Sequence, residues 1–283
     1  MRLLRYGQEG AEKPGLLDRE GRIRDLSGHV PDITPGVLAQ DRLARLAGLE
    51  PSSLPLVEGR PRLGCPIAGV PNLICIGLNY EDHARETNSP IPKEPIVFMK
   101  HTGCIIGPND QVRIPRGATK TDWEVELGVV IGKRGSYVGE ADALDHVAGY
   151  CVVNDVSERD YQRNGGGGQW IKGKSPDTFG PIGPWLVTRD EVPDPQDLKL
   201  WCEVDGKRYQ NGTTATMIFD VRHLVSHVSR YMTLLPGDVI STGTPPGVGA
   251  GVKPEPVFLK PGQSMRLSVE GLGEQRQEVI AAQ

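Results

Sequence analysis

The ten residues 122–131, Asp-Trp-Glu-Val-Glu-Leu-Gly-Val-Val-Ile, constrain the fold of this chain more than any other stretch. The run from 127 to 131 is apolar and rich in β-branched residues, which is typical of a strand buried in a sheet. Because strand side chains alternate between two faces, Glu124 and Glu126 point to the same side. The sequence therefore predicts a buried strand that begins with two carboxylates on one face.

Two like charges on a buried strand are unfavourable unless a cation lies between them. No Lys or Arg of the strand itself shares the face of Glu124 and Glu126. A divalent ion would neutralise the pair, and ligands that are all oxygen favour Mg2+, Mn2+ or Ca2+. The alternative is a half-exposed strand whose glutamates are solvated by water. The pair alone leaves both interpretations open.

The composition favours a β-rich fold with many turns. Among 283 residues there are 36 Gly and 24 Pro, while only 5% are aromatic, which argues against a helical bundle. The net charge of −4 gives no basic surface, so no nucleic acid partner is expected. The chain has no long uncharged apolar run and no signal-peptide pattern at its start, so no membrane partner is expected either.

The cysteines give no sign of a metal knuckle or a disulfide framework. They are odd in number, widely spaced and without a C-x-x-C pair. Since most of them stand beside apolar residues, we expect buried free thiols in a reducing compartment, and therefore a cytoplasmic protein. The five are Cys65, Cys75, Cys104, Cys151 and Cys202.

The chain divides into two parts by its pattern of turns. Residues 1–66 are predicted to form a small N-terminal module and linker, and residues 67–283 a larger domain that holds the candidate catalytic residues described below. In the first part, Thr34 and Pro35 resemble the N-cap and first residue of a helix that Gly48 would end. No candidate catalytic residue lies in this part.

A histidine and a glutamate stand one helical turn apart after the apolar stretch at 72–78. Asn79 is expected to cap a short helix on which His83 and Glu86, at positions i and i+3, share one face. A histidine oriented by a carboxylate is the arrangement of a general base. An exposed polar helix with a fortuitous His–Glu pair is the alternative.

More charged residues follow the apolar run at 147–153. Asp155 stands at the exit of this predicted strand, where it is well placed to be a third metal ligand. Arg159 offers a guanidinium that suits the bidentate binding of a substrate carboxylate. Lys172 and Lys174 are both candidates for stabilising an oxyanion.

Two loops complete the set of candidates. The four glycines at 165–168 match neither a P-loop nor a dinucleotide-binding fingerprint, so they predict a mobile loop, and whether it is a lid stays open. Farther along, a strand ends in the segment 241–249, whose hydroxyls and backbone N–H groups suit the binding of a carboxylate.

Taken in order along the chain, these segments resemble the fumarylacetoacetate hydrolase family over roughly residues 70–280. Each motif is weak alone, but the set is specific. The motifs are Gly77-Leu78-Asn79-Tyr80-x-x-His83-x-x-Glu86, Glu124-x-Glu126-Leu127-Gly128-Val129-Val130, Asn154-Asp155-x-Ser157-x-Arg159-Asp160, Lys174-Ser175, and Gly237-Asp238-x-Ile240-x-Thr242-Gly243-Thr244-Pro245.

The resemblance implies a mixed, β-rich α+β fold, namely a β-sandwich roll with few short helices, preceded by a small N-terminal α+β module. It also implies a homodimer that uses Mg2+ or Mn2+. One departure is Leu78, where several family members carry an Arg that binds substrate. By motif, the metal ligands are Glu124, Glu126 and Asp155, the water-activating dyad is His83 with Glu86, the oxyanion partner is Lys174, and the substrate contacts are Arg159, Gln162 and Thr244.

Family members cleave or decarboxylate 2,4-dioxo acids. The stretch at 173–179 resembles the branch that acts on 2,4-diketo-3-deoxy sugar acids. The resemblance therefore implies a hydrolase that cleaves the C3–C4 bond of an acylpyruvate, with 2,4-didehydro-3-deoxy-L-rhamnonate or its L-fuconate counterpart giving pyruvate and lactate. An oxaloacetate decarboxylase or dioxo-acid isomerase of the same family and a non-catalytic metal-binding protein are the alternatives.

Overall fold

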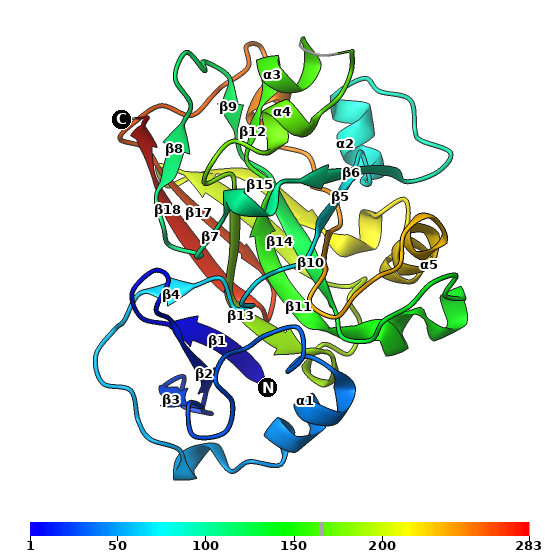
Figure 1. Cartoon of the computed structure of the whole chain (residues 1–283). Helices are drawn as coiled ribbons and strands as arrows, with labels where there is room; N and C mark the ends of the chain where they lie inside the picture. Colours follow the sequence, from blue (N-terminus) through cyan, green and yellow to red (C-terminus); the bar gives the residue numbers. More distant parts are fainter. Residues whose placement is uncertain (165–166, 283) are drawn as a thin grey trace.

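The computed structural model describes residues 1–164 and 167–282, and a large mixed sheet runs through its centre (Figure 1). Most neighbouring strands of this sheet are antiparallel, but β16 pairs with β5, and β13 with β7, in parallel. In spatial order its strands are β3 (Ile23–Asp25), β2 (Lys13–Leu17), β1 (Arg2–Tyr6), β13 (Gly180–Thr188), β11 (Val147–Asn154), β10 (Val125–Ile131), β16 (Val239–Ser241), β5 (Leu73–Gly77) and β6 (Ile96–Lys100), with β4 (Leu63–Gly64) on β1 and β7 (Ile105–Ile106) on β13.

A second sheet of five strands packs against the first. Its order is β15 (Lys207–Thr213), β14 (Lys199–Val204), β17 (Ser264–Val269), β18 (Gly273–Ala281) and β8 (Val112–Ile114), and a short ribbon pairs β12 (Ser157–Glu158) with β9 (Thr121–Asp122). The α-helices are α1 (Gln40–Ala47), α2 (Glu81–Glu86), α3 (Arg159–Arg163), α4 (Ile171–Lys174) and α5 (Val221–Tyr231). Short 3-10 helices lie at Pro51–Ser53, Thr102–Cys104, Glu140–His146, Arg189–Glu191, Thr214–Thr216 and Gly249–Gly251. This is the β-rich architecture with few short helices that the sequence predicts.

Strand β10 divides its side chains between two cores. Val125, Leu127 and Val129 are buried between the two sheets, in a core that also holds residues of β14, β17 and α5. Val130 points the other way, into a second core formed with the N-terminal strands. Glu126 stands four residues before Val130 in the strand, so its side chain points to the same face of the sheet as Val130. The alternation confirms the predicted buried strand.

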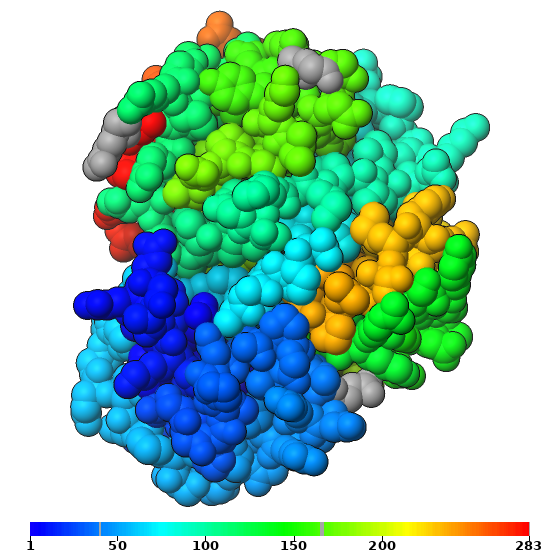
Figure 2. Space-filling model, viewed as in Figure 1, coloured from blue at the N-terminus to red at the C-terminus, as the bar shows by residue number. Residues whose placement is uncertain are grey.

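The N-terminal strands belong to the large sheet. Strand β1 pairs with β13, with Arg2 opposite Val187. The second core contains Leu3 from β1 together with Val130 from β10, so the first segment shares a hydrophobic core with the centre of the molecule. Figure 2 shows this segment, in blue, over the lower part of one face. The division between residues 1–66 and the rest stays a prediction.

The first helix begins later than predicted. Helix α1 starts at Gln40, with no side-chain cap, and not at Pro35. Thr34 is instead the first residue of a turn, in which its carbonyl accepts the N–H of Val37. The Val37 side chain is buried in the second core, and this burial overrides the local helix signal. The end of the helix at Gly48 is as predicted.

Two long strands have no counterpart among the predicted elements. Strand β13 contains two prolines and two glycines, and the register of its pairing with β11 shifts where Gly183 and Pro184 lie. Strand β18 is largely polar, but Gln275 is fully buried and donates to the carbonyls of Val152 and Gly183 at 2.8 and 3.0 Å. Both strands are stabilised by partners far away in the sequence, which local patterns do not reveal.

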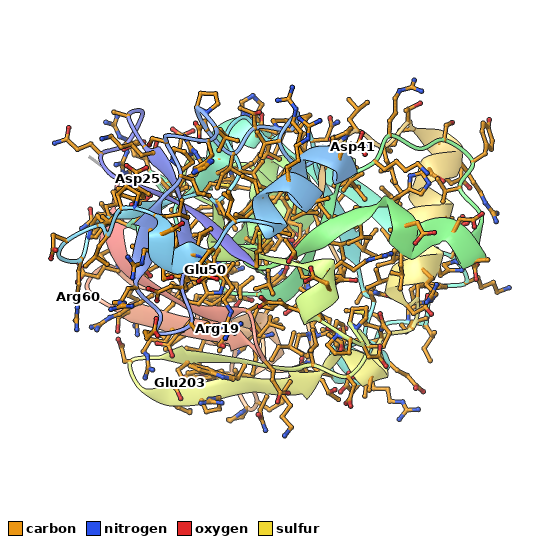
Figure 3. All side chains as sticks on the ribbon, turned by 90° about the horizontal axis from the view of Figure 1, so that it is seen from below. Arg19, Asp25, Asp41, Glu50, Arg60 and Glu203 are labelled. Atoms are coloured by element: carbon orange, nitrogen blue, oxygen red, sulfur yellow. The ribbon has the colours of Figure 1, made fainter. Side chains whose placement is uncertain are left out.

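Three smaller findings bear on the expectations. All five cysteines are buried and unpaired, as predicted. Charges of both signs are spread over the end of the molecule seen in Figure 3, where Arg19, Asp41 and Glu50 are labelled. Among the described helices, none is both long and apolar enough to cross a membrane.

Part of the predicted glycine loop, at 165–166, lies outside the described residues. The homodimer stays a prediction.

Candidate active site

Three carboxylates meet where β10 begins and β11 ends. In this antiparallel pair Val125 lies opposite Asn154, so the residue that follows β11 is brought next to the one that precedes β10. The N–H of Asp155 donates to the Glu124 carbonyl at 2.9 Å. Carboxylate oxygens of Glu124, Glu126 and Asp155 all lie within 4.8 Å of one another, and all three side chains are buried. The predicted ligand set is therefore assembled in space.

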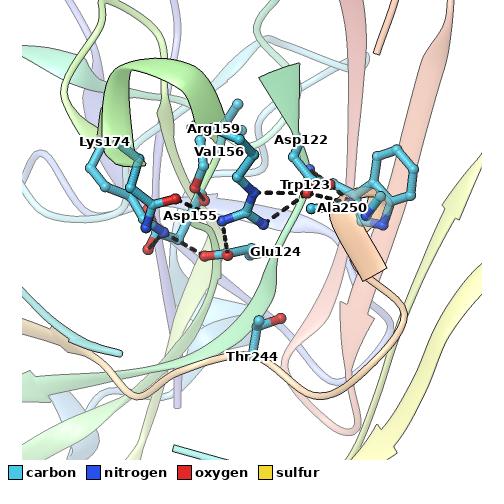
Figure 4. Close-up of polar contacts among 12 residues, drawn as sticks. Asp122, Trp123, Glu124, Asp155, Val156, Arg159, Lys174, Thr244 and Ala250 are labelled. Carbon is cyan, nitrogen blue, oxygen red and sulfur yellow. Dashed lines mark hydrogen bonds and ion pairs between the residues drawn. The ribbon is translucent and has the colours of Figure 1, made fainter. Parts of the chain in front are cut away.

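Cations from other elements surround this cluster (Figure 4). Lys174 of α4 lies with its Nζ atom 2.6 Å from Glu124 Oε2 and 2.6 Å from Asp155 Oδ2. Arg159 of α3 lies 2.7 Å from Glu124 Oε1, and Lys100 of β6 lies 2.5 Å from Asp155 Oδ1. Each of these two carboxylates thus contacts two cationic side chains.

Glu126 has a different environment. Its Oε2 atom accepts hydrogen bonds from the Ser241 hydroxyl at 2.6 Å and from the Gly243 N–H at 2.9 Å. Both donors are neutral. Burial and the negative charges of Asp155 and Glu124 raise the pKa of Glu126 well above its ordinary value. The centre is short of positive charge at this position.

The pKa values of Glu124 and Lys174 are shifted towards the charged forms of these two groups. Burial alone would raise the pKa of Glu124, but Lys174 and Arg159 lower it below its usual range. Burial alone would lower the pKa of Lys174, but Asp155 and Glu124 raise it. Glu124 and Asp155 contact cationic side chains, whereas Glu126 accepts hydrogen bonds from neutral donors. Three carboxylates with this arrangement of partners suit the binding of a hard divalent ion. Glu124, Glu126 and Asp155 are the residues that would hold it.

The predicted dyad is formed. His83 Nδ1 lies 3.1 Å from Glu86 Oε2, and the Glu86 carboxylate also accepts the N–H of Gly247 at 3.0 and 3.1 Å. Because a carboxylate only accepts, the proton of the neutral imidazole belongs on Nδ1, and Nε2 is left as an acceptor. His83 is 7% exposed, which is enough to reach the cavity described below.

The cap predicted for this helix is wrong. Helix α2 has Tyr80 at its N-cap, and no side chain caps it. The Asn79 side chain instead donates to the carbonyls of Thr242 at 2.8 Å and Phe219 at 3.0 Å, and accepts the N–H of Phe219 at 2.9 Å. Asn79 therefore ties the start of α2 to the loop after β16, and this tertiary role overrides its local capping tendency.

A cavity of about 210 Å³ joins the dyad to the carboxylates. Of the nine predicted site residues, eight line it, and the ninth, Glu86, does not. The apolar part of the wall consists of Ile76, Leu78, Phe98 and Trp170. The eight are His83, Glu124, Glu126, Asp155, Arg159, Gln162, Lys174 and Thr244.

The predicted substrate contacts already have partners within the protein. Arg159 donates through Nε to Asp122 at 2.9 Å and through NH1 to Gln162 at 3.1 Å. The Thr244 hydroxyl donates to the Val125 carbonyl at 2.9 Å, and it also accepts a hydrogen bond from Gln210 at 2.8 Å. Their roles towards a substrate stay predictions.

Three residues of the centre are missing from the predicted set. Asp122 is fully buried and accepts the N–H groups of Gly249 at 2.6 Å and Ala250 at 2.9 Å besides the Arg159 guanidinium. Asp122 stands two residues before Glu124, the same spacing that separates Glu124 from Glu126, and this spacing could have identified it from the sequence. The other two are Lys100, a charge at the end of an apolar strand, and Ser241, the last residue of β16.

Comparison with known proteins shows the family of this chain. Residues 72–280 match the family described as fumarylacetoacetate (FAA) hydrolase C-terminal. The chain is 65% identical over 283 residues to a protein of Burkholderia cenocepacia strain HI2424, covering 100% of both; the name of that protein calls it a hydrolase and gives no substrate. The chain therefore belongs to the fumarylacetoacetate hydrolase family.

Three solved structures share the fold. Fumarylacetoacetate hydrolase of Exiguobacterium antarcticum has a TM-score of 0.87 and 35% identity, over 100% of both chains. A 2-hydroxyhepta-2,4-diene-1,7-dioate isomerase of Mycobacterium marinum has a TM-score of 0.75 and 33% identity, over 99% of this chain and 98% of that one. Maleylpyruvate hydrolase of Sphingobium sp. SYK-6, solved with manganese(II) and pyruvate, has a TM-score of 0.81 and 27% identity over 100% of both.

Proposed function

We propose that this protein is a divalent-metal-dependent hydrolase that cleaves the C3–C4 bond of a 2,4-dioxo acid. The observation that carries the proposal is that the His83 imidazole and the carboxylates of Glu124, Glu126 and Asp155 line one cavity. The manganese and pyruvate in the related maleylpyruvate hydrolase support both the type of ion and the type of product.

The dyad supplies the base for this reaction. With Nδ1–H held by Glu86, Nε2 of His83 takes a proton from a water molecule, and the water oxygen bonds to C4. The C3–C4 bond then breaks, and its electron pair passes to the pyruvate part. Return of the proton to C3 gives pyruvate and a second acid, with one water consumed. No nucleophilic Ser or Cys takes part.

Negative charge develops on the pyruvate part as the bond breaks. The position of Lys174 in the wall of the cavity and its raised pKa support its ammonium group as the one that stabilises this charge. A bound Mg2+ or Mn2+ would supply polarisation of the 2-oxo group as a Lewis acid. Stabilisation of this charge by the Lys174 ammonium group would lower the barrier to bond cleavage.

The walls of the cavity support a small substrate with an apolar end. A cavity of about 210 Å³ lies below the roughly 300–1,000 Å³ that is usual for drug-sized ligands. Leu78, Phe98 and Trp170 form an apolar part of the wall, while Arg163 also lines the cavity. We infer a substrate whose acyl part ends in a methyl group, such as 2,4-didehydro-3-deoxy-L-rhamnonate or its L-fuconate counterpart, with lactate as the second product.

An isomerase or a decarboxylase is the second candidate. It is favoured by the likeness to the isomerase of Mycobacterium marinum, since isomerisation and oxaloacetate decarboxylation also pass through an enolate but need no water attack. A metal-binding protein without activity is the third. These candidates differ in whether water enters the product and in whether pyruvate is released.

A coupled assay tests the proposal. The protein with Mg2+ or Mn2+ is offered the sugar-derived dioxo acids, acetylpyruvate, maleylpyruvate and oxaloacetate, and pyruvate is measured with lactate dehydrogenase and NADH. The proposal predicts the highest kcat/KM with a sugar-derived dioxo acid. Pyruvate from oxaloacetate alone would favour a decarboxylase, and no pyruvate from any acid would contradict hydrolysis and favour an isomerase or a non-catalytic role.

A further inference from the structure

A second buried lysine, Lys100, contacts the carboxylate cluster without lining the cavity. It is the last residue of β6, and its side chain is fully buried. Its Nζ atom lies 2.5 Å from Asp155 Oδ1 and 3.0 Å from the carbonyl oxygen of Val156. A buried ammonium group is unfavourable unless it is paired and hydrogen-bonded, and here it has both kinds of partner.

The two oxygens of Asp155 are held by two different lysines. Lys100 holds Oδ1, and Lys174 holds Oδ2 and also binds Glu124. Lys174 lines the cavity, so a hydrogen bond from Lys174 to a substrate oxygen would compete with its contacts to these two carboxylates. Lys100 is shut off from the cavity and has no competing task. It is therefore the contact that keeps Asp155 in place throughout a reaction.

We propose that Lys100 is a positioning residue of the metal centre: it fixes and neutralises the Asp155 carboxylate, which frees Lys174 to act on the substrate. The inference rests on the proposed function in that it takes Asp155 as a metal ligand. Groups that hydrogen-bond to a ligating side chain commonly change metal affinity by about 10–100-fold when they are removed. Lys100 would be such a group, contributed by a strand far away in the sequence.

The substitution Lys100→Met removes the charge and both hydrogen bonds while keeping a similar volume. We expect the Kd for Mn2+ to rise about 10-fold or more. We also expect kcat to fall more than KM changes, because Lys174 becomes the only cation on Asp155 and stays bound to it. Lys199→Met, at an exposed lysine at the start of β14, is the matched control and should leave both quantities unchanged.

Mn2+ binding is titrated by electron paramagnetic resonance without substrate, after circular dichroism has shown a native fold. A weakened Mn2+ affinity in Lys100→Met supports the inference. A wild-type or tighter affinity overturns it, and a lower melting temperature beside that result would mean that the role is structural only. If the Met variant does not fold, Lys100→Gln is titrated in its place, with the same two outcomes. A wild-type protein that binds Mn2+ but cleaves no dioxo acid would refute the proposed function and leave this test intact.

Discussion

His83 and Glu86 are joined by a contact of 3.1 Å between Nδ1 and Oε2, but only His83 lines the cavity. The same Glu86 carboxylate accepts the N–H of Gly247, so it also ties α2 to the loop after β16. The two residues consequently have unequal tasks. In the proposed reaction His83 would meet the attacking water, whereas Glu86 would fix the tautomer and the direction of the ring.

Removal of the imidazole should affect chemistry and not binding. For His83→Ala we expect kcat to fall by about 10²–10⁴, the usual contribution of a general base. Binding of oxalate, a pyruvate analogue, should stay within about twofold by calorimetry, because the carboxylates and Lys174 are untouched. Loss of oxalate binding would show that His83 is a binding residue and would contradict its role as base.

The charge of Glu126 should be essential for the ion. The variant Glu126→Gln keeps the shape and the hydrogen bonds to Ser241 and Gly243 but removes one of three anionic ligands. We expect turnover to be lost and the Kd for Mn2+ to rise by more than tenfold, measured by titration. Glu278→Gln, at an exposed glutamate of β18, is the control. Full activity of Glu126→Gln would refute the metal assignment.

Gly77 should control the wall of the cavity. A β carbon there would lie 2.5 Å from Cζ3 of Trp170, so Gly77→Ala has to displace the indole. Such overpacking costs about 1–3 kcal/mol, and we expect KM to rise about tenfold or more. The control is Gly28→Ala, where a β carbon meets nothing within 4 Å. An unchanged KM in Gly77→Ala would show that Trp170 does not shape the site.

The sequence predicts the local parts of this centre well. Alternation predicts that Glu124, just before β10, and Glu126 within it lie on one side, and their carboxylates do meet there. Helical spacing places His83 beside Glu86. What it does not predict is the set of cations that stabilise the carboxylates. Lys100 comes from β6, and Lys174 from α4, so their meeting at Asp155 depends on the order of strands in the sheet.

Local signals also fail where tertiary contacts compete with them. Asn79 is a good capping residue in isolation, but its side chain bridges Thr242 and Phe219 in the folded protein. The prolines and glycines of β13 hide a strand whose partners are β1 and β11. In both cases a contact with a distant segment is stronger than the preference of the local sequence.

The N-terminal hairpin offers a test of pH dependence outside the site. Burial of Asp18 opposes ionisation, but hydrogen bonds from the Arg22 backbone and from the Arg24 and Arg22 guanidinium groups outweigh it and hold the pKa below its usual range. In the unfolded chain the pKa of an aspartate is about 3.9. Because the pKa of Asp18 is lower in the folded protein, its ionisation stabilises the fold at pH values above about 3.9, and this stability is lost as the pH falls through the folded-state pKa. Asp18→Asn should therefore be less stable than wild type at pH 7.

Urea unfolding at a series of pH values measures this effect. The difference in the free energy of unfolding between wild type and Asp18→Asn should shrink as the pH falls below about 4, because the wild-type carboxylate then loses its advantage. Asp41→Asn, at an exposed residue of α1, is the control. A difference that is constant from pH 7 to pH 3 would mean that the charge of Asp18 does not stabilise the hairpin.

The most direct test of hydrolysis by the His83 dyad follows the oxygen of water. The wild-type protein, with Mn2+ and the dioxo acid that it turns over best, is incubated in H2 18O, and both products are analysed by mass spectrometry. We predict one 18O atom in the new carboxylate of the second acid, at a rate that falls about 10²–10⁴-fold in His83→Ala. Release of pyruvate with CO2, or an isomerised product without 18O in a new carboxylate, would contradict the account.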